Sequence, residues 1–375
     1  MSTSIIRSIL HYIYLKAGER SIAGSRIEQE EGAALKGTKP FGAALPKVAF
    51  ICDEMTWQDF SPCCNAVFLH PALWREQMEE FQPDFLFCEA AWSGIRGYEG
   101  VWRGRVYRDR RLRFENRRVL LELLSYCRVH QIPTVFWAKE DPIFFQHPVY
   151  DYTQTALEFD LVFTTARECI ERYRALGHTR VFLLPFGVDT DRFYPDGSVP
   201  QAGTAVFAGS WFGDQPERCR VLERLLDFSL ERGLELEIYD RKYNSGQKRF
   251  RFPSRYSPYL HPPVPYEQTP EMFRRYEYAI NVNTVTNSAT MCSRRLLQLA
   301  ACGATIISNQ TEVFSTLSDC LETWDSDCDG IVFARGNLSR IAARYSTQQQ
   351  FLSVQSEVKF FRSGKEHSLY GSGMV

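Results

Sequence analysis

The chain has 375 residues, of which 44% are hydrophobic and 24% are charged, so it suits two globular domains. Its formal net charge of −1 gives no overall attraction to nucleic acid or to a membrane surface. The eleven cysteines contain no CxxC pair, which argues against structural zinc and a secreted disulfide framework and favours a cytoplasmic protein with reduced thiols.

Residues 1–46 are expected to form an N-terminal extension. Within it, residues 5–15 are apolar but contain Arg7 and His11, and no run of eighteen apolar residues occurs anywhere in the chain. We interpret residues 5–15 as a docking helix. A peripheral membrane contact is the alternative, because Arg7 and Lys16 flank apolar and tyrosine side chains.

Residues 47–197 alternate between short apolar runs and helical patterns. The expected strands are residues 47–52, 84–88, 132–137, 161–165 and 181–184. The expected helices are residues 71–81, 119–130, 153–159 and 166–176. Strands separated by helices of this length form parallel units with right-handed crossovers, so this segment predicts an α/β domain.

Residues 195–203 are rich in Pro, Gly and Ser and are interpreted as a linker, after which the alternation restarts. The expected strands are then residues 204–208, 234–239, 278–282 and 304–308, with an edge strand at 331–333. The expected helices are residues 216–232 and 269–276 and a short one that begins near 291. The pattern predicts a second α/β domain over residues 198–345, facing the first across a cleft, and a tail at 346–375 that crosses back.

The short helix near residue 291 has one face on which three of the four side chains are polar. Met291, Arg294, Arg295 and Gln298 are three or four positions apart, and Gly303 follows where a helix end favours a left-handed residue. A basic helix face of this kind is similar to the nucleotide-sugar signature of group 1 glycosyltransferases. An ordinary surface helix with solvated arginines is the alternative.

Further segments extend this likeness over residues 47–320. They are AAW at 90–92, TVFWAKEDP at 134–142, FDLVFTT at 159–165, LPFGVDTDRFYP at 184–195, VFAGSW at 206–211, IYDRKY at 238–243 and INVN at 280–283. In this order they resemble the CgeB-like (spore-maturation type) bacterial glycosyltransferases, which are group 1 enzymes with the GT-B fold. The resemblance implies two Rossmann-like domains facing each other across a cleft, a nucleotide-diphosphate-sugar donor in the second domain, and transfer without an obligatory metal or other cofactor.

On the donor side, the family pattern places an arginine three residues before a carboxylate. Arg295 fits this arginine better than Arg294, and either would neutralise the departing diphosphate. Gln298 occupies the carboxylate position, where an amide keeps an acceptor for ribose hydroxyls but loses the charge. Thr290 occupies the position of a second acidic residue eight positions earlier, so both carboxylates are missing.

Other donor-side candidates follow strand ends. Gly209 and Ser210 form a turn in which the backbone can approach a diphosphate, although a plain βα turn explains them equally well. Tyr239 and Asp240 are expected to border the nucleobase and ribose, with an exposed turn as the alternative. Asn283 stands near a strand end, from which its side chain is expected to reach the cleft.

On the acceptor side, the loop after residue 137 carries three charges. Glu140 or Asp141 is expected to orient or deprotonate an acceptor hydroxyl, and Lys139 to meet a phosphate; a solvated loop is the alternative. Thr164 ends a neighbouring strand and is a candidate acceptor contact, whereas Thr165 is expected to cap the next helix.

The arginine-rich segment and the histidines are two further sets of residues with binding chemistry. Residues 103–118 contain eight arginines, which we interpret as a solvated insertion in the absence of a nucleic-acid-binding module. The histidines show no ligand spacing, so no metal site is assigned.

The leading hypothesis is a glycosyltransferase acting on an envelope, spore or secondary-metabolite acceptor. Gln298 and the short C-terminal segment favour, as the main alternative, a weak or inactive protein that binds nucleotide sugar or acts as a partner subunit. A polyol-phosphate transferase that uses residues 103–118 on an acidic acceptor is the third hypothesis.

Overall fold

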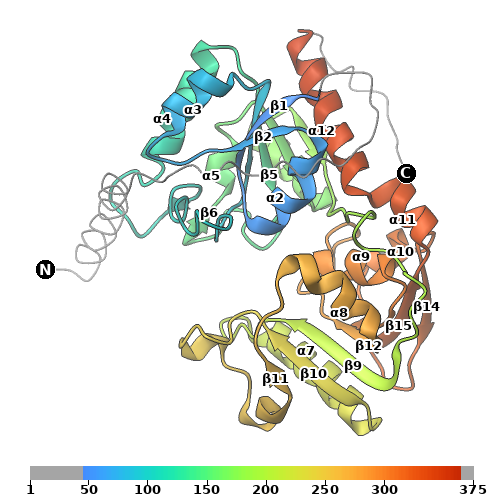
Figure 1. The fold of residues 1–375 in the computed structure, drawn as a ribbon. Coiled ribbons are helices and arrows are strands. Elements are labelled where there is room, and N and C mark those ends of the chain that lie inside the picture. Colours follow the sequence, from blue (N-terminus) through green and yellow to red (C-terminus); the bar gives the residue numbers. More distant parts are fainter. Residues whose placement is uncertain (1–44, 365–375) are drawn as a thin grey trace, which may run out of the picture. The chain divides into compact units, whose positions relative to one another are not determined.

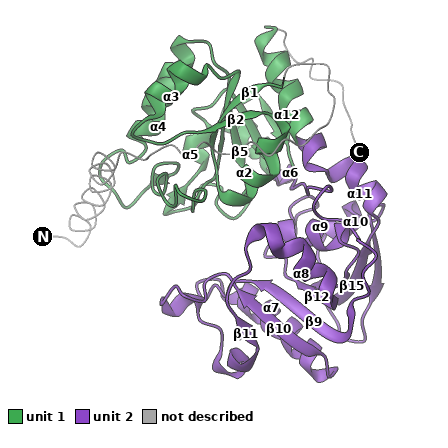
Figure 2. Ribbon diagram, in the orientation of Figure 1, with its two compact units in different colours: residues 1–164, 169–184, 351–375 green, residues 165–168, 185–350 purple. Residues whose placement is uncertain are grey.

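The computed structural model describes residues 45–364, and within them the chain forms two compact units (Figure 2). The first unit holds residues 45–164, 169–184 and 351–364, and the second holds residues 165–168 and 185–350. The second unit therefore starts before the expected linker. Most of the expected N-terminal extension, including residues 5–15, lies outside the described residues.

The first unit is built on a six-stranded parallel sheet with the order β2-β1-β3-β5-β7-β8 (Figure 1). Its strands are β1 (Lys47–Ile51), β2 (Asn65–Phe68), β3 (Phe85–Glu89), β5 (Thr134–Ala138), β7 (Leu161–Thr164) and β8 (Val181–Leu183). Every residue of β3 and β5 is buried, as expected for parallel strands covered on both faces. The edge strand β2 is not among the expected strands, because only one of its four residues is fully buried.

Helices and a small ribbon complete the first unit. They are α2 (Glu54–Phe60), α3 (Trp74–Phe81), α4 (Arg118–Val129), α5 (Thr153–Ala156), α6 (Arg167–Ala175), the 3₁₀ helix η1 (Ser61–Cys63), and the antiparallel strands β4 (Arg108–Asp109) and β6 (Tyr150–Asp151). In α4, Leu120, Leu123, Leu124 and Cys127 are buried. This spacing of three or four residues is the reason that the sequence predicts the helix.

The second unit is built on a seven-stranded sheet with the order β11-β10-β9-β12-β13-β15-β14. Its strands are β9 (Gln201–Gly209), β10 (Glu235–Asp240), β11 (Leu260–His261), β12 (Tyr276–Asn281), β13 (Thr305–Asn309), β14 (Leu321–Asp325) and β15 (Ile331–Gly336). Strands β9 to β13 are parallel, and β15 joins them antiparallel. The strand expected at 331–333 is present as part of β15, but it is not at the edge of the sheet, because β14 pairs on its outer side. Four of the five β14 residues are exposed, so the sequence has no apolar run from which this strand could be predicted.

Helices cover both faces of the second sheet (Figure 1). The helices are α7 (Pro216–Glu231), α8 (Thr269–Arg275), α9 (Arg294–Ala301), α10 (Val313–Thr316) and α11 (Leu338–Tyr345), with the 3₁₀ helices η2 (Lys248–Phe250), η3 (Ser254–Tyr259) and η4 (Tyr266–Gln268). On one face, Leu222 and Leu226 of α7 pack with Phe207, Ile238 and Ile280. Helices α8 and α9 lie over the other face.

The last described helix, α12 (Thr347–Arg362), begins in the second unit and continues in the first. In the first unit, the ring of Phe351 contacts those of Phe60 and Phe85, at centroid distances of 5.8 and 6.4 Å. Near its end, Arg362 pairs with Asp84 at 3.4 Å. The segment predicted to be a tail thus supplies a packed helix to the first unit.

Each parallel sheet has one place where the strand order reverses. In the first unit the reversal falls between β1 and β3, and in the second it falls between β9 and β12. Open α/β sheets bind ligands beyond the carboxyl ends of the strands at such a point. The residues that follow β1, β3, β9 and β12 are therefore the first places to look for a site.

Within residues 45–364, no helix combines the length and the apolar character that crossing a bilayer requires. All eleven cysteines are free thiols, and most are buried.

Candidate functional site

Gly209 ends β9 at the reversal point of the second sheet, and Arg295 from the first turn of α9 lies directly against it. A Cβ atom on residue 209 would lie 2.7 Å from Arg295 Nη2 and 2.6 Å from Phe207 Cζ. The Arg295 guanidinium rests over the Phe207 ring, 4.7 Å from its centroid. The absence of a side chain at residue 209 therefore opens the space that this guanidinium occupies.

Two buried polar atoms at this turn have no hydrogen-bond partner among the described residues. They are Nη1 of Arg295 and Oγ of Ser210, and Ser210 as a residue is completely buried. An unpaired buried donor costs about 1–3 kcal/mol, and more when it is charged. An unpaired guanidinium N–H that lies against Gly209 and an unpaired hydroxyl on the next residue, Ser210, are the kind of donors that an anionic oxygen would satisfy.

Two further arginines surround this turn. Nη1 of Arg218, in the first turn of α7, donates to the Ser210 carbonyl oxygen at 3.0 Å, and the backbone N–H of Arg241 donates to the Gly209 carbonyl at 3.0 Å. Burial, and then the charges of Arg241 and Arg218, lowers the pKa of Arg295 well below its ordinary value. Burial followed by the charge of Arg241 lowers the pKa of Arg218 to about 10. An anion bound here would relieve this mutual repulsion.

The N-terminus of α9 is fixed by asparagines of the neighbouring strand. Oδ1 of Asn283 accepts a hydrogen bond from the Ser293 backbone N–H at 2.8 Å, and Oδ1 of Asn281 accepts one from the Ser293 hydroxyl. Asn283 also donates through Nδ2 to Thr311 Oγ1 at 3.3 Å. Asn283 is buried, so the structure uses its side chain to anchor the helix that carries Arg295, instead of exposing it to a ligand as expected.

Arg294 and Gln298, which are also on α9, contact residues outside the Gly209 turn. The Arg294 guanidinium lies over the Phe186 ring at 4.9 Å. Gln298 is buried, and its Nε2 donates to the Tyr266 hydroxyl of η4 at 2.8 Å. Of the two arginines, the structure brings only Arg295 to Gly209, and the expected ribose contact of Gln298 stays a prediction.

Tyr239 and Asp240 point to opposite faces of β10, since successive strand residues alternate. The Tyr239 hydroxyl donates to Glu237 Oε2 at 2.7 Å and lies 3.0 Å from the Tyr276 hydroxyl. Asp240 is the strand neighbour of Gly209, and its Oδ1 accepts from the Lys242 backbone N–H at 2.8 Å. Asp240 therefore lies beside the Gly209 turn, whereas Tyr239 belongs to a separate tyrosine–glutamate cluster.

Thr290, which replaces an acidic residue of the family pattern, has a structural role. Its hydroxyl donates to the Thr165 carbonyl at 2.9 Å and accepts from the Arg167 backbone N–H at 2.9 Å. Thr165 was expected to cap α6, but the helix starts at Arg167, one residue after Ala166. The Thr290 hydroxyl therefore receives the first N–H of this helix.

Lys139 follows β5 in the first unit and lies between two carboxylates. Its Nζ is 2.9 Å from Asp53 Oδ2 and 2.8 Å from Glu89 Oε1. Asp53 follows β1 and Glu89 ends β3, so this group occupies the reversal point of the first sheet. Lys139 was expected to bind a phosphate. In the structure its ammonium group instead forms ion pairs with the carboxylates of Asp53 and Glu89.

Asp53 also organises the loop after β3. Its Oδ1 accepts from the backbone N–H groups of Trp92, Ser93 and Gly94, at 3.0, 2.7 and 2.8 Å. Burial alone would raise the pKa of Asp53, but Lys139 and these N–H groups hold it below its ordinary value. Neither Asp53 nor Glu89 is a sequence-predicted site residue, although each stands at the end of a strongly apolar strand, and this position was a usable signal.

Asp141 and Thr164 are brought together as neighbours at the same sheet edge. The Thr164 hydroxyl donates to Asp141 Oδ2 at 2.7 Å, and both residues are buried. Burial raises the pKa of Asp141 to about 7, even though hydrogen bonding to Thr164 lowers it. A carboxyl group with such a pKa can exchange a proton near neutral pH. Glu140, next to it, is half-buried.

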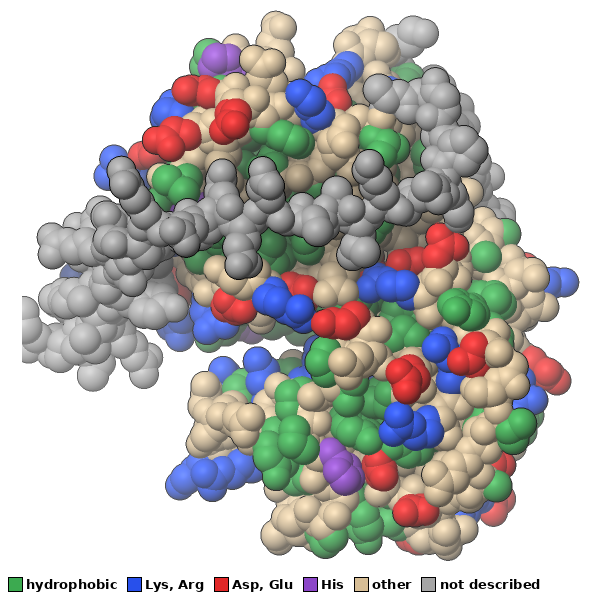
Figure 3. Space-filling model, in the orientation of Figure 1, with side chains coloured by type: hydrophobic (Ala, Val, Ile, Leu, Met, Phe, Trp, Pro, Cys, Tyr) green, Lys and Arg blue, Asp and Glu red, His purple; other side chains and the backbone are tan. Residues whose placement is uncertain are grey.

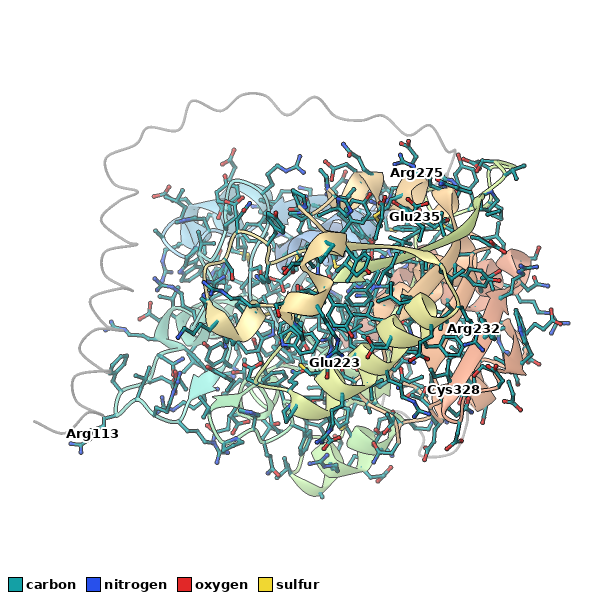
Figure 4. The ribbon with its side chains drawn as sticks, turned by 90° about the horizontal axis from the view of Figure 1, so that it is seen from below. Arg113, Glu223, Arg232, Glu235, Arg275 and Cys328 are labelled. Carbon is teal, nitrogen blue, oxygen red and sulfur yellow. The ribbon has the colours of Figure 1, made fainter. Side chains whose placement is uncertain are left out.

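The arginine-rich segment 103–118 is mostly satisfied by its own surroundings. Arg110 pairs with Asp151, Arg111 with Asp109, and Arg117 with Glu115. Arg113 is exposed and points away from the fold (Figure 4). On the face drawn in Figure 3, basic side chains are interspersed with acidic ones. The segment is thus a folded, internally paired insertion, more ordered than the solvated loop expected from the sequence.

No group of three or more His, Cys, Asp or Glu residues within residues 45–364 is arranged to hold a metal ion.

Comparison with known proteins adds one sequence match and several structural ones. Residues 223–337 match the family described as "Glycosyl transferase-like", a segment that includes Asp240, Arg295 and Gln298 but not Gly209. No curated protein matches the chain.

Two solved structures illustrate the structural likeness. The structure of an alpha-glucosyltransferase (AGT) in complex with UDP is similar over 87% of this chain and 97% of that chain, with a TM-score of 0.50 and 8% sequence identity. A second structure, of an alpha-glucosyltransferase with UDP and a 13-mer DNA containing an HMU base, covers 86% of this chain and 91% of that chain, with a TM-score of 0.48 and 9% identity.

The likeness to the UDP complex and the two Rossmann-like parallel sheets define the fold as GT-B. The expected fold class is confirmed. The sequence match to a glycosyltransferase-like family covers residues 223–337, which lie in the second unit.

Proposed function

We propose that this protein is a glycosyltransferase whose second unit binds a nucleotide-diphosphate sugar at the Gly209 turn. The observation that carries the proposal is the pair of unpartnered buried donors, Arg295 Nη1 and Ser210 Oγ. A diphosphate offers several anionic oxygens that would accept from both. The match of residues 223–337 to a glycosyltransferase-like family supports the same function.

In the proposed reaction the positive charge of Arg295 and Arg218 acts on the leaving group. Negative charge grows on the diphosphate as the bond from the sugar to the phosphate oxygen breaks. Preorganised cations in a buried site stabilise such developing charge, and one donor of this kind is worth about 3–4 kcal/mol of activation free energy. The pairing of Ser293 with Asn283 holds the helix so that Arg295 need not reorganise during the reaction.

The acceptor hydroxyl requires a group that receives its proton as it attacks the sugar. Asp141 is our proposed base, because its pKa of about 7 suits proton transfer at neutral pH. Glu140 is the alternative base on the same loop. We propose an envelope, spore or secondary-metabolite acceptor and the CgeB-like subtype on the sequence motifs alone, and a reaction that needs no metal.

The test is donor turnover. Purified protein should release nucleoside diphosphate from at least one of UDP-glucose, UDP-N-acetylglucosamine, GDP-mannose and dTDP-glucose, and Arg295→Met should abolish this release. Conversion of the exposed Arg113 to Met is the matched control and should leave turnover unchanged. Binding of UDP without turnover of any donor would instead favour a protein that binds nucleotide sugar without transferring it.

A second candidate is a weak or inactive binder, and Gln298 is the observation that favours it. The Nε2 of Gln298 donates to the Tyr266 hydroxyl, and this hydrogen bond fixes the side chain of Gln298 between α9 and η4. If the missing carboxylate limits activity, Gln298→Glu should raise turnover several-fold at unchanged UDP affinity. No change in either quantity would exclude residue 298 from the donor site.

A further inference from the structure

A hollow of about 640 Å³ lies in the second unit at the edge opposite the Gly209 turn. Its walls include Tyr278 near the start of β12 and Thr305 at the start of β13, which are the amino ends of parallel strands. Gly209 and Arg295 belong to the carboxyl edge of the same sheet. The hollow is therefore separate from the proposed donor site.

Aromatic rings form one wall of the hollow. Trp324 on β14 stacks on Phe333 of β15, with ring centroids 5.7 Å apart and an angle of 13° between the planes. Tyr278 on β12 continues the row, 6.2 Å from Phe333. Trp324 is 41% exposed, so much of the indole surface is open to a ligand. The Phe333 ring also packs against Phe228 of α7, at a centroid distance of 6.0 Å. Helix α7 ends at Glu231, and the next residue, Arg232, pairs with Asp327 of the β14–β15 connection, beside Cys328 (Figure 4).

Polar groups of both signs lie beside these rings. Arg335 donates through Nη2 to Thr305 Oγ1 at 2.6 Å, and Glu277 Oε2 accepts from the Gly203 backbone N–H at 2.6 Å. Glu277, Thr305 and Arg335 all line the hollow. A guanidinium has five donors and a carboxylate about four acceptor positions, so both groups keep capacity for a ligand.

This combination discriminates between classes of ligand. A nucleic acid would need an excess of positive charge, whereas the lining of the hollow contains one arginine and one glutamate. A lipid chain would need an enclosed apolar cavity, whereas this hollow is open and carries hydrogen-bonding groups. A sugar ring has an apolar C–H face, which the negative face of an aromatic ring attracts, and a rim of hydroxyls that pair with carboxylate and guanidinium groups.

We propose that this hollow is a second carbohydrate site, which binds a neutral oligosaccharide through stacking on Trp324 and hydrogen bonds to Glu277 and Arg335. The proposal goes beyond donor binding. It names a site for a glycan chain at the far edge of the unit, and it does not depend on the protein being an active transferase.

Saturation-transfer NMR with the full chain tests the proposal, using maltotetraose, chitotetraose and xylotetraose as probes. At least one probe should receive magnetisation through its ring protons at millimolar concentration. Trp324→Ala should weaken that binding about tenfold, the scale of one aromatic contact. Trp324→Phe, which keeps a ring, should lose less, and Tyr243→Ala, which removes another exposed aromatic side chain of this unit, should bind like the wild type.

Saturating UDP should leave the oligosaccharide signal unchanged, because the two sites lie at opposite edges of the sheet. Thermal unfolding of each variant checks that the fold is intact. The proposal is overturned if no probe receives magnetisation, if Trp324→Ala binds as tightly as the wild type, or if UDP displaces the probe. A dimer in light scattering that Trp324→Ala dissociates, with no probe bound, would assign this face to a second copy of the chain instead.

Discussion

The Arg295 guanidinium occupies the space that a side chain on Gly209 would fill, with Nη2 only 2.7 Å from the position of the missing Cβ. The two residues are 86 positions apart in the chain, yet the reversal point of one sheet places them together. The donor site proposed above depends on this relationship.

Gly209→Ala tests the relationship by steric means. The backbone of Gly209 is outside the left-handed region, so alanine causes no backbone strain there, and the added methyl must displace Arg295 or Phe207. We expect the dissociation constant for UDP, measured by calorimetry, to rise at least about tenfold, equivalent to 1.4 kcal/mol. Ala208→Ser, on the opposite face of the strand, is the control and should bind UDP normally. Unchanged affinity in Gly209→Ala would mean that Arg295 does not contact the nucleotide.

Arg295→Met should make the ligand-free protein more stable. The substitution removes a buried cation that has an unpartnered Nη1 and keeps a similar apolar stem above Phe207. Replacing buried charges by apolar side chains of similar volume is often neutral or stabilising by about 1–4 kcal/mol. Urea unfolding without nucleotide measures the difference. A clear loss of stability would show that the guanidinium is a structural group and not one reserved for an anion.

Lys139→Met should destabilise the first unit strongly. It leaves the carboxylates of Asp53 and Glu89 close together without their cation, and breaking a buried pair in this way costs about 3–5 kcal/mol. Adding Glu89→Gln to Lys139→Met should recover part of the loss, because it removes one uncompensated charge. The free energy of unfolding in urea provides the measurement. A loss below about 1 kcal/mol, the range of surface pairs, would contradict a structural role for this cluster.

Asp141 predicts a specific dependence of stability on pH. Its pKa is about 7 in the folded protein against an ordinary 3.8, so between these values the folded state keeps a proton that the unfolded chain loses. The contribution of Asp141 to the free energy of unfolding should therefore fall as pH rises from about 4 to 7, by up to about 4 kcal/mol at 1.36 kcal/mol for each pKa unit. Asp141→Asn should remove this slope and be more stable than the wild type at pH 7.

The same substitution separates stability from catalysis. If Asp141 accepts the acceptor proton, Asp141→Asn should lose transfer at every pH although it is more stable. Glu140→Gln should retain the wild-type dependence of stability on pH. A wild-type slope in Asp141→Asn would contradict the raised pKa.

The sequence predicts those parts of the fold whose signals are local. The periodic Leu120, Leu123, Leu124 and Cys127 predict α4, and the apolar run before Gly209 predicts the strand whose end opens the donor site. Four of the five residues of strand β14 are exposed, and the strand forms by pairing with β15. Its own residues therefore do not predict a strand.

The candidate site divides in the same way. Gly209 was predicted from a strand-to-helix turn and Arg295 from the family pattern on its helix, but their contact depends on the order of the strands in the sheet. Asp53, Glu89 and Lys139 are separated by 36 and 50 positions and meet only because three parallel strands end at one edge. Asn283 was expected to reach a cleft, but its side chain is buried and bonded to Ser293. Strand alternation indicates on which face a side chain lies, but it cannot show which residues cover that face.

Calorimetric titration of UDP into the wild type and Arg295→Met tests the central claim most directly. Hydrogen bonds to a charged group contribute about 1.5–3 kcal/mol, so Arg295→Met should bind UDP about 10- to 150-fold more weakly while its ligand-free fold stays intact. Equal affinity of the two proteins for UDP, or no binding of UDP or any other nucleoside diphosphate to the wild type, would contradict a diphosphate site at Gly209, Ser210 and Arg295.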